Sequence, residues 1–521
     1  ALGAASERDA VYRQVKKLKE MGCNAIRTSH NTPSSVLLEA CNELGMMVMD
    51  ETFDGWAFPK NGNSQDFSTH FNQTISADNK LLGATTGDTW YKFILESNIE
   101  RDKNDPSVII WDIGNELNFG VTDPSQYEQY AKNMKSYIEA IDKTRPITVG
   151  DNNPGGLANA NTTEFRNKVS TVLAKNGEGL AGANYSMGAM SGIHNTHPDW
   201  KIIATETASP SNSRGIYNTL SQYNKTGDYQ CTAYDTNAVS WGNTARESWW
   251  YTIKDDFVSG EFIWTGFDYL GEPTPYSVYP VGVSSFGTID TAGFAKDVVY
   301  MYKSMWTDTP TVHLLPQKWN FKAGQKVPVY IYTNAKSGEL FLNGKSLGIK
   351  NYDKQTASPV YIYWTKGTSG LDYEAGELKA VGYDQPDGKG NVIATDVVNT
   401  SGDAAQVELS ADRTYIKNDG DDMVFVEATI EDNTGIMVPG ADNRITFDVE
   451  GGEIVSVDNG DPRDHDPYKN TDNRKAFSGK ALLIVKAEEG STDDIVITAT
   501  AESDNGILKS NTITVGSKNE L

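Results

Sequence analysis

Cysteine is scarce in this chain: three among 521 residues, an odd number that cannot form a complete set of disulfide pairs. Stability therefore does not depend on disulfides, which fits a cytosolic protein and also one secreted by a Gram-positive bacterium. Long hydrophobic runs are missing as well, since no stretch approaches the ~18 apolar residues of a membrane span. Positive charge is limited, with 46 Lys and Arg against 70 Asp and Glu and a formal net charge of −24. Because phosphate binding needs a basic face, this balance argues against nucleic acid and against anionic membranes as partners.

The length and the pattern of the chain predict several domains. At about 100–200 residues per domain, 521 residues suffice for about three. From residue 6 to about 306, helical and strand-like segments alternate, beginning with a helix over 6–21 that Ser6 would cap and Gly22 would end. Strands that alternate with helices of this length predict βα units and a parallel sheet.

The predicted strands share one property: each begins apolar and ends in a polar or aromatic residue. These residues are His30, Glu51, Glu116, Tyr185, Glu206 and Asp268. In a (β/α)8 TIM barrel the carboxyl ends of the strands converge on one mouth, where the active site lies. A doubly wound sheet also gathers its strand ends, but the chain has neither G-x-G-x-x-G nor G-x-x-x-x-G-K, the usual phosphate-binding turns of such sheets. The pattern therefore favours the barrel.

The pattern changes after about residue 307. Short alternating strands separated by Gly, Asn and Asp turns are typical of β-sandwiches. We expect a catalytic barrel over 1–306 and two immunoglobulin-like β-sandwich domains over 307–401 and 402–521.

Two strand-end glutamates, Glu116 and Glu206, suggest a chemistry. Hydrolysis of a glycosidic bond needs two carboxyl groups facing each other across the anomeric carbon, one to protonate the leaving oxygen and one to attack or to activate water. We place them on the fourth and seventh barrel strands, which stand across the mouth from each other. The alternative for either residue alone is a structural one, capping a loop or pairing with an arginine.

Several stretches resemble glycoside hydrolase family 2, and most closely its β-galactosidases. The likeness covers the whole barrel portion, and both β modules match the accessory domains of longer family members. The stretches are "MGCNAIRTSHNTPSSVLLEACNELGMMVMDETFDGW", "RDKNDPSVIIWDIGNE", "ATETAS" and "GEFIWTGFDYLGEPTPY".

The resemblance implies a retaining mechanism and roles for particular residues. Glu116 matches the acid/base of the family, and Glu206 matches its nucleophile. Asn115 matches the residue that hydrogen-bonds the sugar 2-hydroxyl, Tyr185 the tyrosine beside the nucleophile, and Trp264 the aromatic floor under the sugar.

Four further residues are expected around the pocket on the same ground. His30, Asn31 and Glu51 match pocket-lining positions, and Trp56 is placed where it would extend an aromatic platform toward the aglycone. Asp112, within the strand that ends at Glu116, is interpreted as a structural hydrogen-bonding residue.

The chain departs from the family pattern in three respects. Gly55 stands where some members have a metal-binding Glu, so we predict neither a metal nor a cofactor, and the oxygen-rich segment 458–466 is read as an acidic turn rather than a Ca²⁺ site. The Asn-x-Lys pair with which the glucuronidases of the family bind the sugar carboxylate is missing from "VGVSSFGTIDTAGF". A neutral sugar, galactose, is therefore expected.

The third departure lies at the start of the sequence, which begins without Met and without a signal-peptide pattern. Family members have a jelly roll, an immunoglobulin-like domain and the first barrel strand before this point. We expect this chain to be the C-terminal piece of a longer protein, because a barrel without its first strand leaves two strand edges open.

Together these observations predict a retaining exo-β-galactosidase that acts on terminal β-linked galactose of an oligosaccharide or glycan. The alternatives are a β-mannosidase or β-glucuronidase on the same fold, and a non-catalytic carbohydrate-binding protein with the barrel as a scaffold. Acidity and the appended β modules favour a secreted or cell-surface bacterial enzyme, with the cytoplasm as the alternative location. Homo-oligomerisation stays open.

Overall fold

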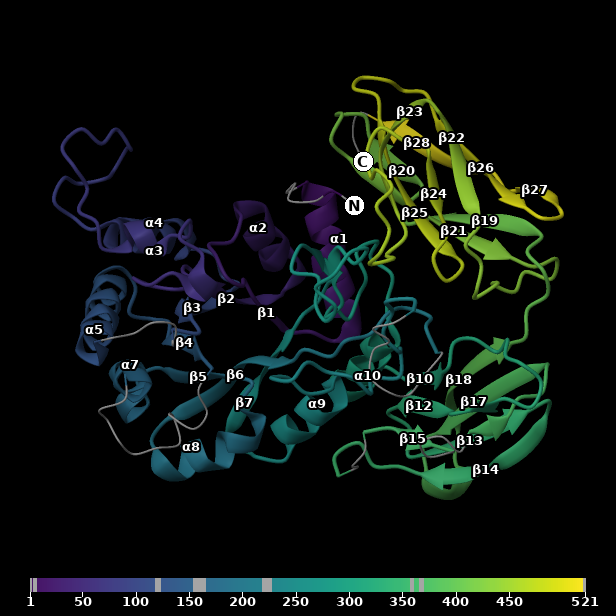
Figure 1. Ribbon diagram of the computed structural model, residues 1–521, viewed down its shortest axis with the longest axis horizontal. Helices are drawn as coiled ribbons and strands as arrows, with labels where there is room; N and C mark the ends of the chain where they lie inside the picture. Colours follow the sequence, from purple (N-terminus) through teal and green to yellow (C-terminus); the bar gives the residue numbers. More distant parts are fainter. Residues whose placement is uncertain are drawn as a thin grey trace.

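A computed structural model of the chain describes residues 2, 7–117, 123–152, 165–217, 227–356, 360–364 and 370–518. The part described comprises a parallel sheet surrounded by helices, followed by two β-sandwich domains that lie beside it (Figure 1). The predicted architecture, a barrel followed by two sandwiches, is confirmed. Ser6, the predicted helix cap, lies outside the described residues.

The parallel sheet has seven strands, which follow one another in chain order. They are β1 (Ala25–Arg27), β2 (Met47–Glu51), β3 (Val108–Asn115), β4 (Ile147–Asp151), β5 (Leu180–Asn184), β6 (Lys201–Ala208) and β7 (Val258–Trp264). Within the described residues, β1 pairs only with β2 and β7 pairs only with β6, so the barrel is open between its first and last strands. The first strand of an eight-stranded barrel would lie in this opening.

Helices cover the outside of this sheet. They are α1 (Arg8–Met21), α2 (Ser35–Leu44), α3 (Ser68–Phe71), α4 (Trp90–Asp102), α5 (Pro124–Ile141), α7 (Phe165–Ala174), α8 (Met190–Thr196), α9 (Ala245–Ile253) and α10 (Asp297–Trp306), with 3₁₀ turns at Lys60–Gly62, Lys175–Gly177 and Met187–Ala189. The predicted stop of α1 is confirmed: Gly22 adopts a left-handed conformation with φ 106°, which glycine accepts without steric cost. No helix among the described residues has the length and apolarity needed to cross a lipid bilayer.

The second domain consists of antiparallel sheets. Its strands are β10 (Val312–Leu315), β11 (Lys326–Val327), β12 (Tyr330–Thr333), β13 (Ser337–Leu342), β14 (Lys345–Asn351), β15 (Ile362–Tyr363), β16 (Leu371–Asp372), β17 (Glu377–Tyr383) and β18 (Val392–Asn399), with a 3₁₀ turn at Pro386–Gly388. The larger sheet has the order β14-β13-β17-β18, and β10-β12-β15 forms a second sheet. One apolar core joins this domain to α10 of the barrel, with Met301 and Tyr302 packed together with Leu314 and Tyr332.

The third domain is a second sandwich. Its strands are β19 (Gln406–Ala411), β20 (Tyr415–Lys417), β21 (Met423–Glu431), β22 (Arg444–Glu450), β23 (Gly452–Asp458), β24 (Asn473–Lys475), β25 (Lys480–Ala487), β26 (Ile495–Ser503), β27 (Gly506–Lys509) and β28 (Ile513–Lys518). One sheet has the order β19-β21-β25-β23 and the other β20-β28-β26-β22-β24.

The third domain packs against the barrel beside α1. Phe294 of the barrel shares an apolar cluster with Met423, Phe425 and other residues of the third domain. The carboxylate of Asp9, on α1, accepts a hydrogen bond of 2.7 Å from the backbone N–H of Met423. The helix that begins the described barrel is therefore held by the last domain of the chain.

A buried glutamate on β7 makes the barrel sensitive to pH. Glu261 accepts hydrogen bonds from the hydroxyl groups of Thr207 (2.9 Å) and Thr252 (3.2 Å) with one oxygen, while its other oxygen has no partner among the described residues. Burial raises the pKa of Glu261 from its usual 4.5 to about 7, against the two hydrogen bonds, which lower it. Folded protein therefore retains a proton here at a pH where the unfolded chain has lost it.

We predict that the stability of Glu261→Gln relative to wild type increases as pH rises from 5 to 8. Between the two pKa values the unfolded state loses the proton first, so wild-type stability falls with rising pH, whereas glutamine has no proton to lose. The melting temperature of the variant minus that of wild type should increase by a few degrees over this range in calorimetry. The exposed Glu453→Gln variant serves as the control, and a pH-independent difference for Glu261→Gln would contradict the prediction.

Candidate active site

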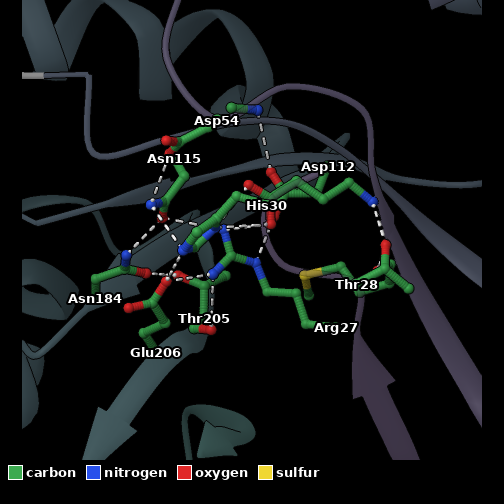
Figure 2. A network of polar contacts seen from close by, with 12 residues as sticks. Arg27, Thr28, His30, Asp54, Asp112, Asn115, Asn184, Thr205 and Glu206 are labelled. Carbon is green, nitrogen blue, oxygen red and sulfur yellow. Dashed lines mark hydrogen bonds and ion pairs between the residues drawn. The ribbon is translucent and has the colours of Figure 1, made fainter. Parts of the chain in front are cut away.

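A buried arginine stands at the centre of the barrel mouth. The guanidinium of Arg27, at the end of β1, lies 2.7 Å (Nε) from Asp112 Oδ2, 2.9 Å (Nη1) from Glu206 Oε1 and 3.0 Å (Nη2) from Glu51 Oε2. Its side chain is 2 % exposed. The three carboxylates come from the carboxyl-terminal halves of β2, β3 and β6, and Figure 2 shows Arg27 reaching between Asp112 and Glu206. The arginine thus links β1 to three other strands of the sheet, β2, β3 and β6.

The charges of this cluster do not cancel, because three carboxylates surround one cation. Burial by itself would lower the pKa of Arg27, but Glu51, Asp112 and Glu206 raise it above its usual value. Burial raises the pKa of Glu51 to about 8 and that of Asp112 to about 7, with Arg27 opposing both shifts. The pKa of Glu206 is also raised, chiefly by burial and in part by Glu116. Arg27 therefore stays charged at neutral pH while its partners retain protons more strongly than exposed acids do.

Asn115, the last residue of β3, has both ends of its amide fixed. Its Oδ1 accepts hydrogen bonds from Arg27 Nη2 (3.1 Å) and Asn184 Nδ2 (2.8 Å). Its Nδ2 lies 3.3 Å from Asp54 Oδ1 and 3.4 Å from His30 Nε2. All of these residues appear in Figure 2. The network fixes which way the amide points, with its N–H groups toward His30 and Asp54.

A glycine leaves the space that this network needs. Gly150, on β4, stands opposite Asn115 in the parallel register of β3 and β4. A Cβ at this position would lie 2.8 Å from Arg27 Nη2 and 2.9 Å from the Oδ1 atoms of Asn115 and Asn184. Any side chain here would displace the arginine or the two amides.

His30 connects the carboxylate cluster to an aromatic wall. Its Nδ1 lies 3.0 Å from Glu51 Oε1 and its Nε2 lies 3.4 Å from Glu206 Oε1. Its ring stacks on Trp264, at the end of β7, with 5.1 Å between centroids and 10° between planes. Burial lowers the pKa of His30, so the ring is neutral at neutral pH. A neutral ring that donates Nδ1–H to Glu51 leaves Nε2 to accept from the amide of Asn115.

Glu116 and Tyr185 both occupy left-handed backbone positions directly after their strands. Their φ angles are 48° and 47°, a conformation that non-glycine residues adopt at a cost of about 1–3 kcal/mol. Each is held there by its own N–H, which donates to the carbonyl of Gly150 (2.7 Å) in Glu116 and to that of Glu206 (2.8 Å) in Tyr185. The Tyr185 hydroxyl lies 2.8 Å from Ser209 Oγ. Both residues act electrostatically on Glu206 or are acted on by it: the charge of Glu206 raises the pKa of Tyr185 in addition to the larger effect of burial, and the charge of Glu116 contributes to the raised pKa of Glu206.

Two of the residues expected around the pocket are placed differently. Trp56 is 1 % exposed, its indole N–H donates to the carbonyl of Ile113 (2.7 Å), and its ring stacks on Tyr127 at 5.4 Å. The prediction that Trp56 forms a platform toward the aglycone is wrong, because the ring packs in the core between β3 and α5. Asn31 is exposed, and among the described residues its side chain joins none of the contacts of the cluster.

The structure adds residues that the sequence analysis did not single out. Arg27 lies within the stretch that begins "MGCNAIRTSHN", and the sequence pattern offers an arginine only as an unspecified structural partner for a strand-end acid. Asn184 ends β5, directly before Tyr185, and Gly150 lies on β4. The available signal was their position at the ends of predicted parallel strands, which places them at the same mouth.

Three residues offer ligand atoms in metal-binding range of one another: His30, Glu51 and Asp54, within 4.8 Å. Glu51 already pairs with Arg27, and the carboxylate of Asp54 pairs with Lys60. Each of these carboxylates therefore already has a cationic partner, and we assign no metal here.

A parallel βα barrel with two glutamates at one mouth is the architecture of a retaining or inverting glycosidase. The comparison with protein families shows to which glycoside hydrolase family the chain belongs. The model of the TIM barrel domain of glycosyl hydrolases family 2 matches residues 1–288, and that of the glycoside hydrolase family 2 C-terminal domain 5 matches residues 407–514. Residues 324–390 match a domain of unknown function, DUF4982. The chain belongs to glycoside hydrolase family 2, as its resemblance predicted.

Relatives in this family carry more than one activity. The chain is 35 % identical to the β-galactosidase BoGH2A of Bacteroides ovatus, in an alignment that covers 96 % of this chain and 58 % of that protein. It is 25 % identical to a β-glucuronidase of Bacteroides fragilis over 68 % of this chain and 47 % of that protein. A crystal structure of a β-glycosidase from Bacteroides vulgatus superposes with a TM-score of 0.80 at 30 % identity, covering 99 % of this chain and 62 % of that one. The chain thus spans less than two thirds of the length of these relatives.

We predict that Arg27→Met destabilises the protein by about 3–5 kcal/mol at pH 8 and by less at pH 5. Removal of the cation leaves three buried carboxylates without compensation, which is costly when they are ionised. At pH 5 the raised pKa values allow them to be protonated instead. Denaturant unfolding of the barrel, followed at both pH values, measures the difference.

Arg8→Met is the matched control, because the side chain of Arg8 is 54 % exposed and pairs with Glu39 on the surface. Exposed ion pairs contribute about 0–1 kcal/mol. If Arg27→Met destabilised the protein equally at both pH values, the charge argument would be wrong and loss of packing would explain the effect.

Proposed function

We propose that the chain carries the catalytic centre of a retaining exo-β-galactosidase, with Glu206 as nucleophile and Glu116 as acid/base. The observation that supports this most directly is the orientation of Glu206. Its Oε1 faces both Arg27 Nη1 (2.9 Å) and His30 Nε2 (3.4 Å). We therefore assign the attack to Oε2, since the guanidinium stabilises the charge on the other oxygen.

In the first step, Oε2 of Glu206 forms a bond to the anomeric carbon while the bond to the leaving oxygen breaks. Glu116 gives its proton to that oxygen, and the aglycone leaves as an alcohol. The charge of Glu206 passes into a neutral ester, and Glu116 is left as a carboxylate. Arg27 keeps its contacts to Glu51 and Asp112 throughout, so the cluster stays ordered when Glu206 loses its charge.

In the second step, Glu116 takes a proton from a water molecule, whose oxygen attacks the anomeric carbon. The ester bond breaks, Glu206 becomes a carboxylate again and Glu116 is protonated for the next cycle. Two inversions at one carbon return the β configuration. The half-exposed position of Glu116 at the end of β3 gives water access to it.

The residues around the pair would hold the terminal sugar. The amide of Asn115, oriented by Arg27 and Asn184, would donate an N–H to the 2-hydroxyl group in place of its long contact to His30 Nε2 (3.4 Å). Trp264 and His30 form a stacked aromatic wall for the apolar face of the ring.

The charge of the site favours a neutral sugar over a glucuronide. The cations whose charges act on Glu51 are Arg27 and Lys60, and both already pair with carboxylates of the protein. A sugar carboxylate would be a further anion in a cluster that already has more acids than cations. Identity to BoGH2A supports galactose among neutral sugars.

We also propose that polypeptide outside this chain supplies an eighth strand between β7 and β1. A cavity of about 930 Å³ lies there, lined by both edge strands, by Leu18 of α1 and by Met305 of α10, and it reaches Glu206. Its inner wall includes Ile110 and Ile203. A parallel strand covered on both faces is apolar throughout, so we expect a continuous run of Val, Ile or Leu in the strand that fills the cavity. Such a longer, acidic gene product with appended β modules fits a secreted or cell-surface enzyme.

We predict that Glu206→Gln lowers turnover of a nitrophenyl β-galactoside by several orders of magnitude without loss of fold. Glu116→Ala should retain activity on this activated substrate better than on lactose, because nitrophenolate leaves without a proton. Added azide should accelerate Glu116→Ala and give the β-galactosyl azide, which identifies the acid/base and the retaining course together. The measurements use the intact gene product that contains this chain.

Glu453→Gln, which changes an acid of the third domain whose side chain is 65 % exposed, is a control that should leave turnover unchanged. Galactoside binding without turnover, unaffected by either glutamate substitution, would favour a carbohydrate-binding protein. Turnover of the glucuronide in preference to the galactoside would overturn the argument from charge.

A separate prediction concerns the open edges of the barrel. Produced alone, this chain should bind an apolar-surface dye such as ANS and unfold at a lower temperature than the intact gene product, because the cavity wall is exposed. If the chain alone were monomeric, cooperative in unfolding and fully active, the eighth strand would not be needed.

A further inference from the structure

A hairpin of the barrel domain extends from the candidate active site to the surface of the third domain. It consists of β8 (Tyr269–Leu270) and β9 (Val283–Ser284), which pair antiparallel directly after β7. The ring of Tyr269 meets Trp264, at the end of β7, edge-on, with 6.0 Å between centroids. The base of the hairpin therefore belongs to the mouth of the barrel.

The outer part of the hairpin exposes apolar side chains. Tyr279 is 78 % exposed, and Leu270 and Val278 are each about half exposed. Large exposed aromatic side chains next to a cleft indicate binding surfaces more often than isolated apolar residues do. Glu272, which accepts a hydrogen bond of 2.9 Å from the Tyr269 hydroxyl, places an exposed carboxylate beside them.

The third domain supports this hairpin from behind. The ring of His465 stacks on Tyr279 with 5.0 Å between centroids and 18° between planes. Its Nε2 lies 2.6 Å from the carbonyl of Pro280, to which it donates, and the N–H of Gly282 donates to the carbonyl of Pro462 (2.9 Å). One face of the Tyr279 ring is thus covered, while the residue as a whole stays accessible.

The segment of the third domain that follows β23 is itself fixed on the barrel. Arg463 donates to the carbonyl of Asp228 (2.7 Å) and pairs with Asp461 (2.9 Å), and Asp461 accepts a hydrogen bond from Gln230 (3.0 Å). The segment 458–466 was predicted to be an acidic turn, and the contacts show what this turn does: it joins the sandwich to the barrel. Because these contacts hold it, the exposed tyrosine keeps one orientation and loses little entropy when a ligand binds.

We propose that Tyr279, supported by His465, forms a subsite for a sugar residue on the leaving-group side of the substrate. This inference rests on the proposed function. In an exo-acting enzyme the terminal sugar fills the barrel pocket, so the part of the substrate that extends past Trp264 and Tyr269 is the aglycone. A pyranose offers an apolar face to an aromatic ring and hydroxyl groups to neighbouring acids such as Glu272. The expected substrate is therefore a galactoside whose aglycone contains at least one further sugar unit, rather than a galactoside of a small alcohol.

The test compares two substrates with one terminal galactose. For Tyr279→Ala in the intact gene product, kcat/KM on lacto-N-neotetraose, whose aglycone is a trisaccharide, should fall about tenfold, mainly through KM. On the nitrophenyl β-galactoside it should stay within twofold, because that aglycone contains no further sugar to occupy the subsite at Tyr279. Tyr279→Phe, which keeps the ring, should restore most of the loss, and His465→Ala should reproduce part of it.

Tyr415→Ala, which removes an exposed tyrosine from β20 of the third domain, the domain that carries His465, is the control and should change neither substrate. Equal losses on both substrates would show that the hairpin positions the catalytic pocket, and no loss on either would show that sugars do not reach it; both results overturn the subsite.

Calorimetric titration with lacto-N-neotetraose separates this inference from the proposed function. If wild type hydrolysed no β-glycoside but bound the tetrasaccharide more weakly after Tyr279→Ala, the proposed activity would fail while the subsite stood. If hydrolysis occurred and binding were insensitive to Tyr279, the subsite alone would fail.

Discussion

The ion pairs of one buried cation hold the mouth of this barrel together. Arg27 reaches carboxylates on three other strands, so the guanidinium fixes the position of the candidate nucleophile and the geometry of the sheet at the same time. A buried charge is expensive unless it is paired and hydrogen-bonded, and here every nitrogen of the guanidinium has a partner. Because three acids share one cation in a buried cluster, the pKa values of Glu51 and Asp112 are raised to about 8 and about 7.

Much of the remaining site follows from the space and orientation that this cation requires. Gly150 has no side chain where Arg27 and two amides meet, and Asn115 is oriented by the hydrogen bond it accepts from Arg27. The left-handed turns at Glu116 and Tyr185 are stable because backbone hydrogen bonds across neighbouring strands hold them. Strain at a strand end is thus balanced by the regular part of the sheet, which is the usual arrangement in an active site.

The sequence could predict the barrel and the gathering of strand-end residues, because both follow from periodicity and from the polarity of the last residue in each strand. It could not predict the partners of those residues. The position of Trp56 depends on tertiary packing: the tryptophan follows a strand-end acid, yet it turns into an aromatic core with Phe71 and Tyr127. Arg27 resembles an ordinary strand residue in the sequence, since only the curvature of the sheet brings three acids to it. The local sequence pattern predicts at which strand end a residue lies. Its contacts across the barrel can be found only from the three-dimensional structure.

The hydrogen bond between Asp9 and Met423 has a consequence for synthesis of the protein. These residues are 414 positions apart, and at about 5–20 residues per second the ribosome needs about 20–80 s to make the intervening chain. During that time the surface of α1 that the third domain later covers has no partner. Contacts of such long range close last and slow the final step of folding. Native assembly of this barrel is therefore completed only after translation of the C-terminal sandwich, and a prematurely terminated chain leaves α1 uncovered on this side.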